Sequence, residues 1–450
     1  MNATHIIEVL EGAPRLVTAA LVVTLYTAPA TAQPMLTLSD AIARAHARNP
    51  DAASAAAAEH EAAARVTQAH GGYFPKVDVA ESWQRGNHPV FVFSSLLAQR
   101  QFTAADLALD AINHPAATDN FRAALSLEQP LFDRAIAANV RAASIARDMA
   151  ATEKRLVDHD LTAAVTDAFG RVLVAAATVR SSAAMVETAR ADREVAGNRR
   201  AAGRATDADV LQLDVYVART LEQQVQAAAD ERIARATLNQ LMGEPLTATF
   251  TLDPTPPTIA VDISHPDALE ADAVEHRPDV ALAKQQGRLA AAAEDAARAA
   301  FLPQVAAQGG WELNGGSWDS RSASWMAGVV VRINLFHGLA DKARLAEARQ
   351  QVARRAIDAG KAETLARLDV QIAIAKLEAA RASEAVGRAA VDQARESRRI
   401  IRERYEGGLT DAAMLLRSAD AVQQADARQI AAHVNVLTAT VTLQRATGKP

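Results

Sequence analysis

The feature that most constrains this chain is a long unbroken helical pattern that starts after Gly338 and stops at Gly407-Gly408. A helix of about 65 residues is about 100 Å long at about 1.5 Å per residue. Small or apolar residues recur along it at spacings of three and four, which is typical of a coiled-coil seam. The seam consists of Leu365, Leu368, Ile372, Ala375, Ala379, Ala382, Val386 and Ala389. Few compact domains need such a long helix, so we expect it to be one helix of a larger helical bundle.

A second long helical hairpin lies earlier in the chain, so the sequence predicts hairpins over 134–243 and 339–446. Each is interrupted once by a glycine turn followed by residues that favour helix starts. The seam of the earlier hairpin consists of Leu161, Val165, Ala168, Val172, Ala175, Val179, Ser182 and Val186.

The two hairpins belong to an internal repeat. Asn49-Pro50 corresponds to Arg277-Pro278, and Phe74-Pro75 to Leu302-Pro303. Further matches are Leu131-Phe132 with Leu335-Phe336, Gly203 and Thr206-Asp207 with Gly407 and Thr410-Asp411, and Gly243 with Gly448. Ordered matches at nearly constant spacing are the signature of a repeated unit. We therefore predict a first repeat over 33–253, a proline-rich linker over 254–266 and a second repeat over 267–450.

Each repeat also contains two segments in which apolar and polar residues alternate, which is the pattern of strands with one apolar face. The expected strands are about 73–83 and 121–131 in the first repeat, and about 303–313 and 325–335 in the second. An unusually long connection, 88–117, joins the first two, and we expect its apolar cluster to pack within the connection itself. A cover over a barrel mouth and a contact with the outer lipid leaflet are the alternatives. The cluster consists of Phe91, Val92, Phe93, Leu96 and Leu97.

The N-terminus has the pattern of a secretory signal peptide, predicted over 1–32. Leu16–Tyr26 is an apolar run too short to span a bilayer, and Ala30-Thr31-Ala32 suits a cleavage site. The chain has no cysteine, which excludes disulfides and thiolate metal sites. Its net charge of −5 and the lack of a basic patch argue against nucleic acid as a partner.

Four amphipathic strands cannot form a sheet in lipid alone, because their edges leave backbone groups unpaired. Either the sheet packs on a soluble core, or several chains pool strands to close one barrel. The helices are far too long merely to cover strands of about ten residues, which favours the pooled barrel. Tryptophans near strand ends, Trp83, Trp311 and Trp325, suit an aromatic belt at a membrane surface.

These motifs together resemble the TolC-like outer-membrane efflux proteins over essentially the whole mature chain. The resemblance rests on the repeat, the Phe74-Pro75 and Leu302-Pro303 strand openings, and the tip motifs around Gly203 and Arg404-Tyr405. It implies a mainly α-helical homotrimer in the outer membrane, with four strands per chain in a 12-stranded barrel continued by a periplasmic α-barrel. It further implies a passive exit duct for small molecules that joins a periplasmic adaptor and an inner-membrane pump. A type I protein secretion duct is the alternative within this family.

In such proteins the hairpin tips form the periplasmic entrance, where carboxylates narrow the pore and the adaptor docks. The gate candidates here are Asp207, Asp209 and Asp411; Asp207 and Asp411 could instead only cap helices. Acids expected six and nine residues after Gly407 are replaced by Ala413 and Leu416. The adaptor-docking candidates are Gly203, Arg204, Thr206, Gly407, Gly408, Leu409 and Thr410, where the glycines could serve the turns alone.

Two other classes of protein compete with the duct. A periplasmic coiled-coil adaptor would have one hairpin, whereas this chain has two. A soluble enzyme would need a convergent set of polar residues, and the sequence has no HExxH pair, phosphate-binding loop or GxSxG turn. We therefore expect no catalysis, no cofactor and no metal.

Overall fold

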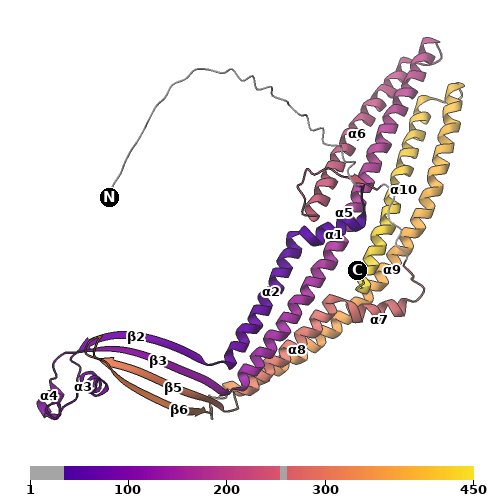
Figure 1. Ribbon diagram of the computed structural model, residues 1–450. Helices are drawn as coiled ribbons and strands as arrows, with labels where there is room; N and C mark the ends of the chain where they lie inside the picture. The colour runs from indigo at the N-terminus through magenta and orange to yellow at the C-terminus, as the bar shows by residue number, and fades with distance from the viewer. Residues whose placement is uncertain (1–34, 254–260, 450) are drawn as a thin grey trace, which may run out of the picture.

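The computed structural model of the protein describes residues 35–253 and 261–449. The predicted signal peptide and residues 254–260 of the predicted linker lie outside the described residues. The molecule is elongated, with a sheet at one end and long helical hairpins at the other (Figure 1). The first repeat contains α1 (Leu38–Arg48), α2 (Pro50–His70), β2 (Lys76–Gly86), α3 (Pro89–Ala98), α4 (Leu109–Asn113), β3 (Thr118–Phe132), α5 (Arg134–Ala201) and α6 (Asp207–Leu241). The second contains α7 (Pro266–His276), α8 (Pro278–Ala299), β5 (Gln304–Gly315), β6 (Ser322–Arg332), α9 (Ala340–Glu406) and α10 (Ala412–Thr447). Short strands β1 (Met35–Leu36) and β4 (Thr251–Leu252) pair in parallel beside the helices.

The two predicted rods are the longest helices, with 68 residues in α5 and 67 in α9. Alanine favours these helices because it loses no side-chain entropy on folding. Asp133 caps the start of α5 by accepting a hydrogen bond from the amide of Ala135 at 2.8 Å. Among the described helices, α5 alone has a window long and apolar enough to cross a bilayer, and 39% of that window is buried inside the protein. Such a window is equally typical of a helix in a protein core.

The repeat is also present in three dimensions, at the ends of the return helices. Gly243 after α6 and Gly448 after α10 both have left-handed backbones, with φ of 68° and 72°. A Cβ on Gly243 would lie 2.5 Å from the carbonyl oxygen of Arg48, and one on Gly448 would lie 2.7 Å from the amide nitrogen of Arg277. Each return helix therefore ends against the junction between the two short helices of its own repeat, where only glycine fits.

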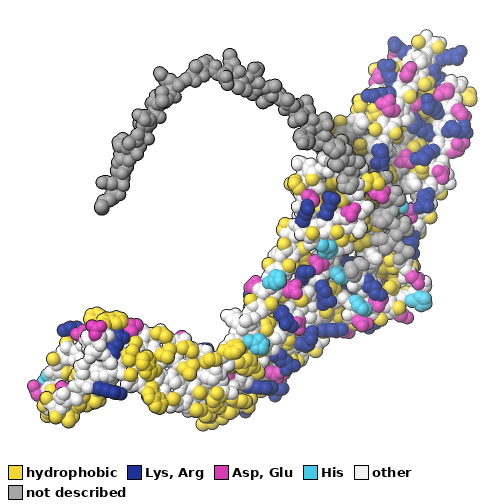
Figure 2. All heavy atoms as spheres, in the orientation of Figure 1, with side chains coloured by type: hydrophobic (Ala, Val, Ile, Leu, Met, Phe, Trp, Pro, Cys, Tyr) yellow, Lys and Arg dark blue, Asp and Glu magenta, His cyan; other side chains and the backbone are white. Residues whose placement is uncertain are grey.

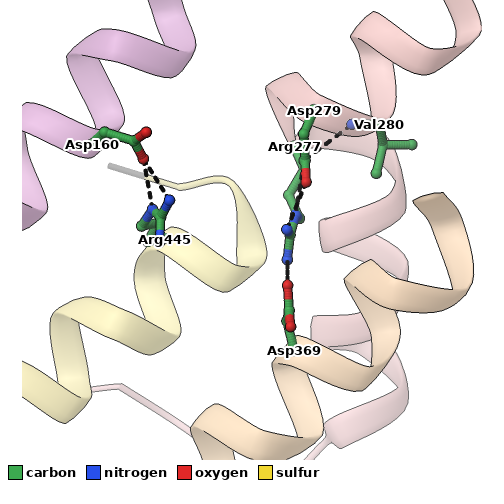
Figure 3. A network of polar contacts seen from close by, with 6 residues as sticks. All are labelled: Asp160, Arg277, Asp279, Val280, Asp369 and Arg445. Atoms are coloured by element: carbon green, nitrogen blue, oxygen red, sulfur yellow. Dashed lines mark hydrogen bonds and ion pairs between the residues drawn. The ribbon is translucent and has the colours of Figure 1, made fainter.

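Two hydrophobic cores lie at the waist of the molecule, one in each repeat. In the first, α1 packs on α5 and α6 around Phe169 and Leu238, and in the second α7 and α8 pack on α9 and α10 around Leu377 and Leu443. Polar contacts fix the same region (Figure 3). Arg277 donates to Asp279 at 2.7 Å and to Asp369 of α9 at 3.0 Å.

The four long strands form one antiparallel sheet in the order β2-β3-β5-β6. The predicted strands are present, but their ends are shifted by up to three residues. β2 starts at Lys76 rather than near residue 73, because Gly71–Tyr73 forms a 3-10 turn. β6 ends at Arg332 rather than near residue 335, because Arg332 pairs with Gln304 and the next position on β5 is Pro303, which has no amide hydrogen.

The two faces of this sheet differ sharply. Cross-strand pairing places Val79 beside Leu125, Leu125 beside Trp311, and Trp311 beside Trp325, so one face is largely apolar. The charged residues in the same register are Glu81, Arg85 and Asp119, toward the end away from the helices. This face is also exposed, with Val79 at 78% and Trp325 at 79%. Figure 2 shows hydrophobic side chains gathered over the sheet, whereas charged ones cover the helices. The opposite face is mostly polar and consists of Lys76, Asp78, Ser82, Gln84, Asn120, Arg122, Ser126, Glu128, Gln308, Glu312, Asn314, Ser322, Ser324 and Arg332, with a few small or apolar residues between them.

The two predicted seams differ in how far the chain itself buries them. On α5, Leu161, Val165 and Val172 are buried against neighbouring helices of the same chain. On α9, all eight predicted seam residues are exposed, and the buried positions are others, such as Val370 and Leu377. The α9 seam is therefore a stripe of small and apolar residues that the chain itself does not cover.

Candidate functional site at the hairpin tips

The tip of the first hairpin is a short turn between α5 and α6. Gly203 has a φ of 68°, and Thr206 caps α6. The Asp209 carboxylate accepts hydrogen bonds from the amide and the hydroxyl of Thr206 at 2.9 and 2.8 Å. The Thr206 hydroxyl in turn accepts from the amide of Asp209 at 3.2 Å, which completes a capping box. These bonds, the one to the amide foremost, hold the pKa of Asp209 below its ordinary value.

The tip of the second hairpin corrects the register of the repeat. Gly408, with a φ of 78°, is the left-handed residue, whereas Gly407 has an ordinary φ of −75°. Gly408 is therefore the counterpart of Gly203, and the assignment of Gly407 to that place was one residue early. Counting six and nine residues from Gly408 reaches Met414 and Arg417 instead of Ala413 and Leu416, and neither is an acid.

Each gate candidate binds a partner within its own hairpin. Asp207 forms an ion pair with Arg200, and Asp209 belongs to the capping box. Asp411 caps α10 by accepting from the amide of Met414 at 2.9 Å. Capping thus accounts for two of the three carboxylates, and their role in a pore stays a prediction.

The docking candidates form the end surface of the molecule. Gly203, Arg204 and Thr206 are exposed, and so are Gly407 and Gly408. Leu409 is 72% exposed and Thr410 is half-buried. An apolar side chain at the end of a charged rod suits a contact with a partner, so docking at these residues stays a prediction.

The two tips pack against each other around a small core that sequence reasoning did not assemble. It consists of Ala196, Val210, Leu213, Tyr405, Ala412 and Leu415. Arg199 of α5 lies over the ring of Tyr405 of α9, with its guanidinium carbon 4.4 Å from the ring centroid. A cation over an aromatic face is attracted by the ring quadrupole. This contact joins the end of one long helix to the end of the other.

A buried ion pair joins the same two helices about two turns further back. Asp192 of α5 is 1% exposed and accepts a hydrogen bond from Arg398 of α9 at 2.9 Å, with Arg402 at 3.9 Å. Burial raises the pKa of Asp192 above its ordinary value, and the two arginines offset only part of this effect. The sequence carried a signal for this residue, because Met185, Ala189, Asp192 and Ala196 follow a seam spacing of four, three and four, and Asp192 is the one charged member.

A third contact lies further from the tips. Arg219 of α6 forms an ion pair with Asp420 of α10, and its guanidinium lies over the ring of Tyr216, 5.1 Å from the centroid. Burial raises the pKa of Tyr216 to about 12, so this phenol stays protonated at neutral pH. The hairpins are thus tied at three levels along their outer thirds.

The predicted aromatic belt lies on the apolar face of the sheet. Trp83, Trp311 and Trp325 lie within four residues of the strand ends that point away from the helices. Sequence reasoning missed Trp318, which is 61% exposed in the loop after β5, with its ring 5.6 Å from that of Phe121. It also missed a second exposed aromatic row at the helix end of the sheet, formed by Tyr73, Phe74, Phe132, Phe301 and Phe336.

The separation of the two rows can be worked out from the strands. Phe121, which pairs with Trp83, and Phe132 lie on the apolar face of β3, and their partners on β5, Gly315 and Val305, are ten positions apart. At about 3.3 Å per residue and a tilt of about 40°, this is about 25 Å along a barrel axis. A transmembrane barrel has an apolar band about 25 Å tall between aromatic girdles. The spacing of the two rows therefore fits one bilayer.

Within residues 35–253 and 261–449, no group of three or more histidine, aspartate or glutamate side chains could hold a metal ion. Open grooves run between the helices, such as the groove of about 740 Å³ that α5, α6 and α10 line. These grooves are lined largely by alanine, threonine and scattered charges.

An amphipathic sheet whose edge strands have no further partner among the described residues, continued by two hairpins about 100 Å long, is the architecture expected of an outer-membrane channel protein. The comparisons agree. The sequence matches the family described as "Outer membrane efflux protein" over residues 41–244 and 269–449, and the chain belongs to that family.

Among curated relatives, Protein CyaE of Bordetella pertussis is 31% identical over 312 residues, which are 66% of this chain and 64% of CyaE. The alignment thus spans slightly less than two thirds of that relative. Several solved structures share the fold. The outer-membrane channel OprN superposes with a TM-score of 0.77 at 20% identity, covering 92% of this chain and 90% of OprN. VceC of Vibrio cholerae superposes with a TM-score of 0.75 at 18% identity, covering 92% and 96%.

Proposed function

We propose that three copies of this chain form the exit duct of a tripartite efflux system, which passes small molecules through the outer membrane without chemistry of its own. The four strands of each copy would join in one 12-stranded barrel in the outer membrane. The helical hairpins would continue the duct through the periplasm, toward a periplasmic adaptor and an inner-membrane pump.

The exposed seam of α9 is the observation that carries this proposal. Leu368 is 52% exposed and Val386 69% exposed on a face with coiled-coil spacing. The opposite flank of the molecule, on α6, also presents apolar side chains, with Val215 at 70% and Val225 at 72%. A long helix hides such stripes against another helix. The α6 flank of a neighbouring copy also presents apolar side chains at helical spacing and is the partner that we propose for this seam.

The sheet supports the same assembly. Its edge strands, β2 and β6, have no further strand partner among the described residues. Because the order β2-β3-β5-β6 is antiparallel throughout, β6 of one copy and β2 of the next also run antiparallel. Two copies would give eight strands, a number whose interior is filled by side chains. Three copies give 12 strands and a barrel wide enough for a water-filled duct.

The tips supply the proposed entrance. Asp207, Asp209 and Asp411 lie at the start of the return helices, where a ring of carboxylates would favour passing cations. The exposed turn residues from Gly203 to Thr206 and from Gly407 to Thr410 would contact the adaptor. Opening this entrance would require the two hairpins to separate, and the Asp192–Arg398 pair opposes that movement.

The proposal is tested by purifying the protein from outer membranes in mild detergent and measuring its mass and its conductance in planar bilayers. We expect a heat-dissociable trimer with small, cation-selective currents that grow when Asp209 and Asp411 become alanine. A matched control is Asp167→Ala, which changes an exposed carboxylate of α5 far from the tips. A water-soluble monomer without conductance would refute the duct.

A further inference from the structure

The β2–β3 connection, residues 87–117, lies across the polar face of the sheet at the end away from the helices (Figure 1). Its helix α3 begins beside β2, where the ring of Phe91 lies 3.6 Å from the place of a Cβ on Gly86. Its middle reaches β6, where Arg100 donates to the carbonyl oxygen of Ala323 at 2.9 Å. The connection thus spans all four strands instead of packing only within itself.

Buried polar contacts hold the connection in this place. Gln99 is 3% exposed, and its amide nitrogen donates to the carbonyl oxygen of Asp119 at 2.8 Å and to the side-chain oxygen of Asn120 at 3.1 Å. Asn120 donates to the side chain of Asn314 at 3.0 Å, and Ser322 donates to the carbonyl oxygen of Gln99 at 2.9 Å. A buried amide without these partners would cost about 1–3 kcal/mol, so the contacts fix one position of the connection.

The apolar residues of the connection are divided between two sides. Val92 is 5% exposed, and the rings of Phe93 and Phe102 pack edge to face with centroids 4.7 Å apart. Four others remain uncovered by the chain, and these are Val90 at 71%, Leu97 at 51%, Leu107 at 61% and Leu109 at 77% exposed. No other part of the described chain covers these four side chains, which leaves them available for a contact with another copy.

The size of the barrel identifies that partner. Twelve strands spaced about 4.8 Å apart and tilted about 40° give a backbone radius of about 12 Å. A helix with its side chains is about 10 Å wide. If the polar face lines the duct, as in the function proposed above, each connection extends from the wall to near the three-fold axis. We propose that the connections of the three copies meet there through their exposed apolar residues and constrict the outward mouth of the duct.

The absence of cysteine from the sequence gives a direct test. Single-cysteine variants Leu97→Cys, Leu107→Cys and Leu109→Cys are made in the full-length protein and oxidised as assembled trimers. We expect disulfide-linked pairs of protomers from at least one of them. Val79→Cys and Val329→Cys are matched controls, equally exposed but on the apolar face of the sheet, and should give none.

Conductance supplies an independent readout. Replacing residues 87–117 by the six-residue loop that joins β5 to β6, 316–321, should raise the single-channel conductance severalfold. The point variant Gln99→Ala, which removes the buried amide but keeps the connection, should also raise the single-channel conductance. Trimers that conduct, yet give no cross-link at any of the three positions and no rise with either variant, would overturn the constriction while leaving the duct intact. A protein that forms no trimer overturns both.

Discussion

Replacing Arg398 by methionine is expected to loosen the hairpin tips. Methionine keeps much of the side-chain volume but removes the charge that faces Asp192, whose side chain is 1% exposed. Removing one partner of a buried ion pair typically costs about 3–5 kcal/mol. Because Arg402 remains 3.9 Å from Asp192, we expect the lower end of that range, about 3 kcal/mol. At about 1.4 kcal/mol per factor of ten, the opening of this contact should become roughly 100-fold more frequent.

Hydrogen exchange measures this opening directly. The amides of residues 188–201 and 396–406 should lose protection in Arg398→Met, whereas those of the waist should not. Arg399→Met is the matched control, because Arg399 is exposed and its ion pairs are with Glu396 and Glu403 of its own helix. It should change exchange at the tips by no more than a few-fold.

The double variant Asp192→Asn with Arg398→Met tests whether the unpaired, buried charge of Asp192 causes the faster hydrogen exchange. It removes both charges and should restore most of the protection. If it exchanges as fast as Arg398→Met alone, lost packing explains the effect and the electrostatic reasoning is refuted. Unchanged exchange in Arg398→Met would refute it as well.

The same pair gives a pH dependence with a definite sign. Burial raises the pKa of Asp192 in the folded protein, so folding favours its protonated form. Its contribution to stability is therefore fully present below the unfolded-state pKa and is lost as the pH rises through the raised folded-state pKa. After correction for intrinsic exchange rates, protection of the tips should fall over that rise in the parent protein and stay level in Asp192→Asn.

Three further predictions concern other parts of the molecule. Gly243→Ala should destabilise the waist by at least about 1–2 kcal/mol, which is the cost of a left-handed alanine, and should therefore lower the melting temperature. Gly287→Ala is the control, because Gly287 lies in an open part of α8. It should lower the melting temperature little or not at all. Thr206→Ala should cost about 1 kcal/mol and increase hydrogen exchange in the first turn of α6. Val329→Arg on the apolar face should weaken folding into lipid vesicles by about 2–4 kcal/mol, whereas Ser324→Arg on the polar face should be tolerated in the same urea titration.

Much of the architecture could be predicted because its helices, turns and strands follow from short-range sequence patterns. Helical period, glycine turns and alternation are short-range signals, so both rods and all four strands were found with end errors of up to three residues. The one-residue error at Gly407-Gly408 has a physical cause. Either glycine can adopt a left-handed backbone, and only the packed turn decides which one does.

What could not be predicted depends on contacts between distant segments. The seam of α9 predicts a buried face, but the spacing of its apolar residues does not show whether the same chain or another chain buries that face. Asp192 and Arg398 are 206 residues apart, and their pairing follows from how two hairpins pack rather than from either sequence alone. The apolar cluster of the β2–β3 connection was expected to pack within the connection, as Phe93 and Phe102 do. The contacts of the connection with the polar face of the sheet could not be expected, because that face includes Asn120 and Asn314 from two different repeats.

The open edges of the sheet also have a consequence for how this protein reaches its final state. In the proposed trimer, the outward-facing backbone groups of β2 and β6, which have no strand partner among the described residues, are paired by other copies. Completion of the sheet would then be an encounter between molecules, and its rate would rise with protein concentration, unlike the folding of a barrel made from one chain. Until that encounter, each copy would carry two unprotected strand edges, which are templates for wrong pairing. The proposed assembly thus calls either for rapid association or for a chaperone that covers those edges.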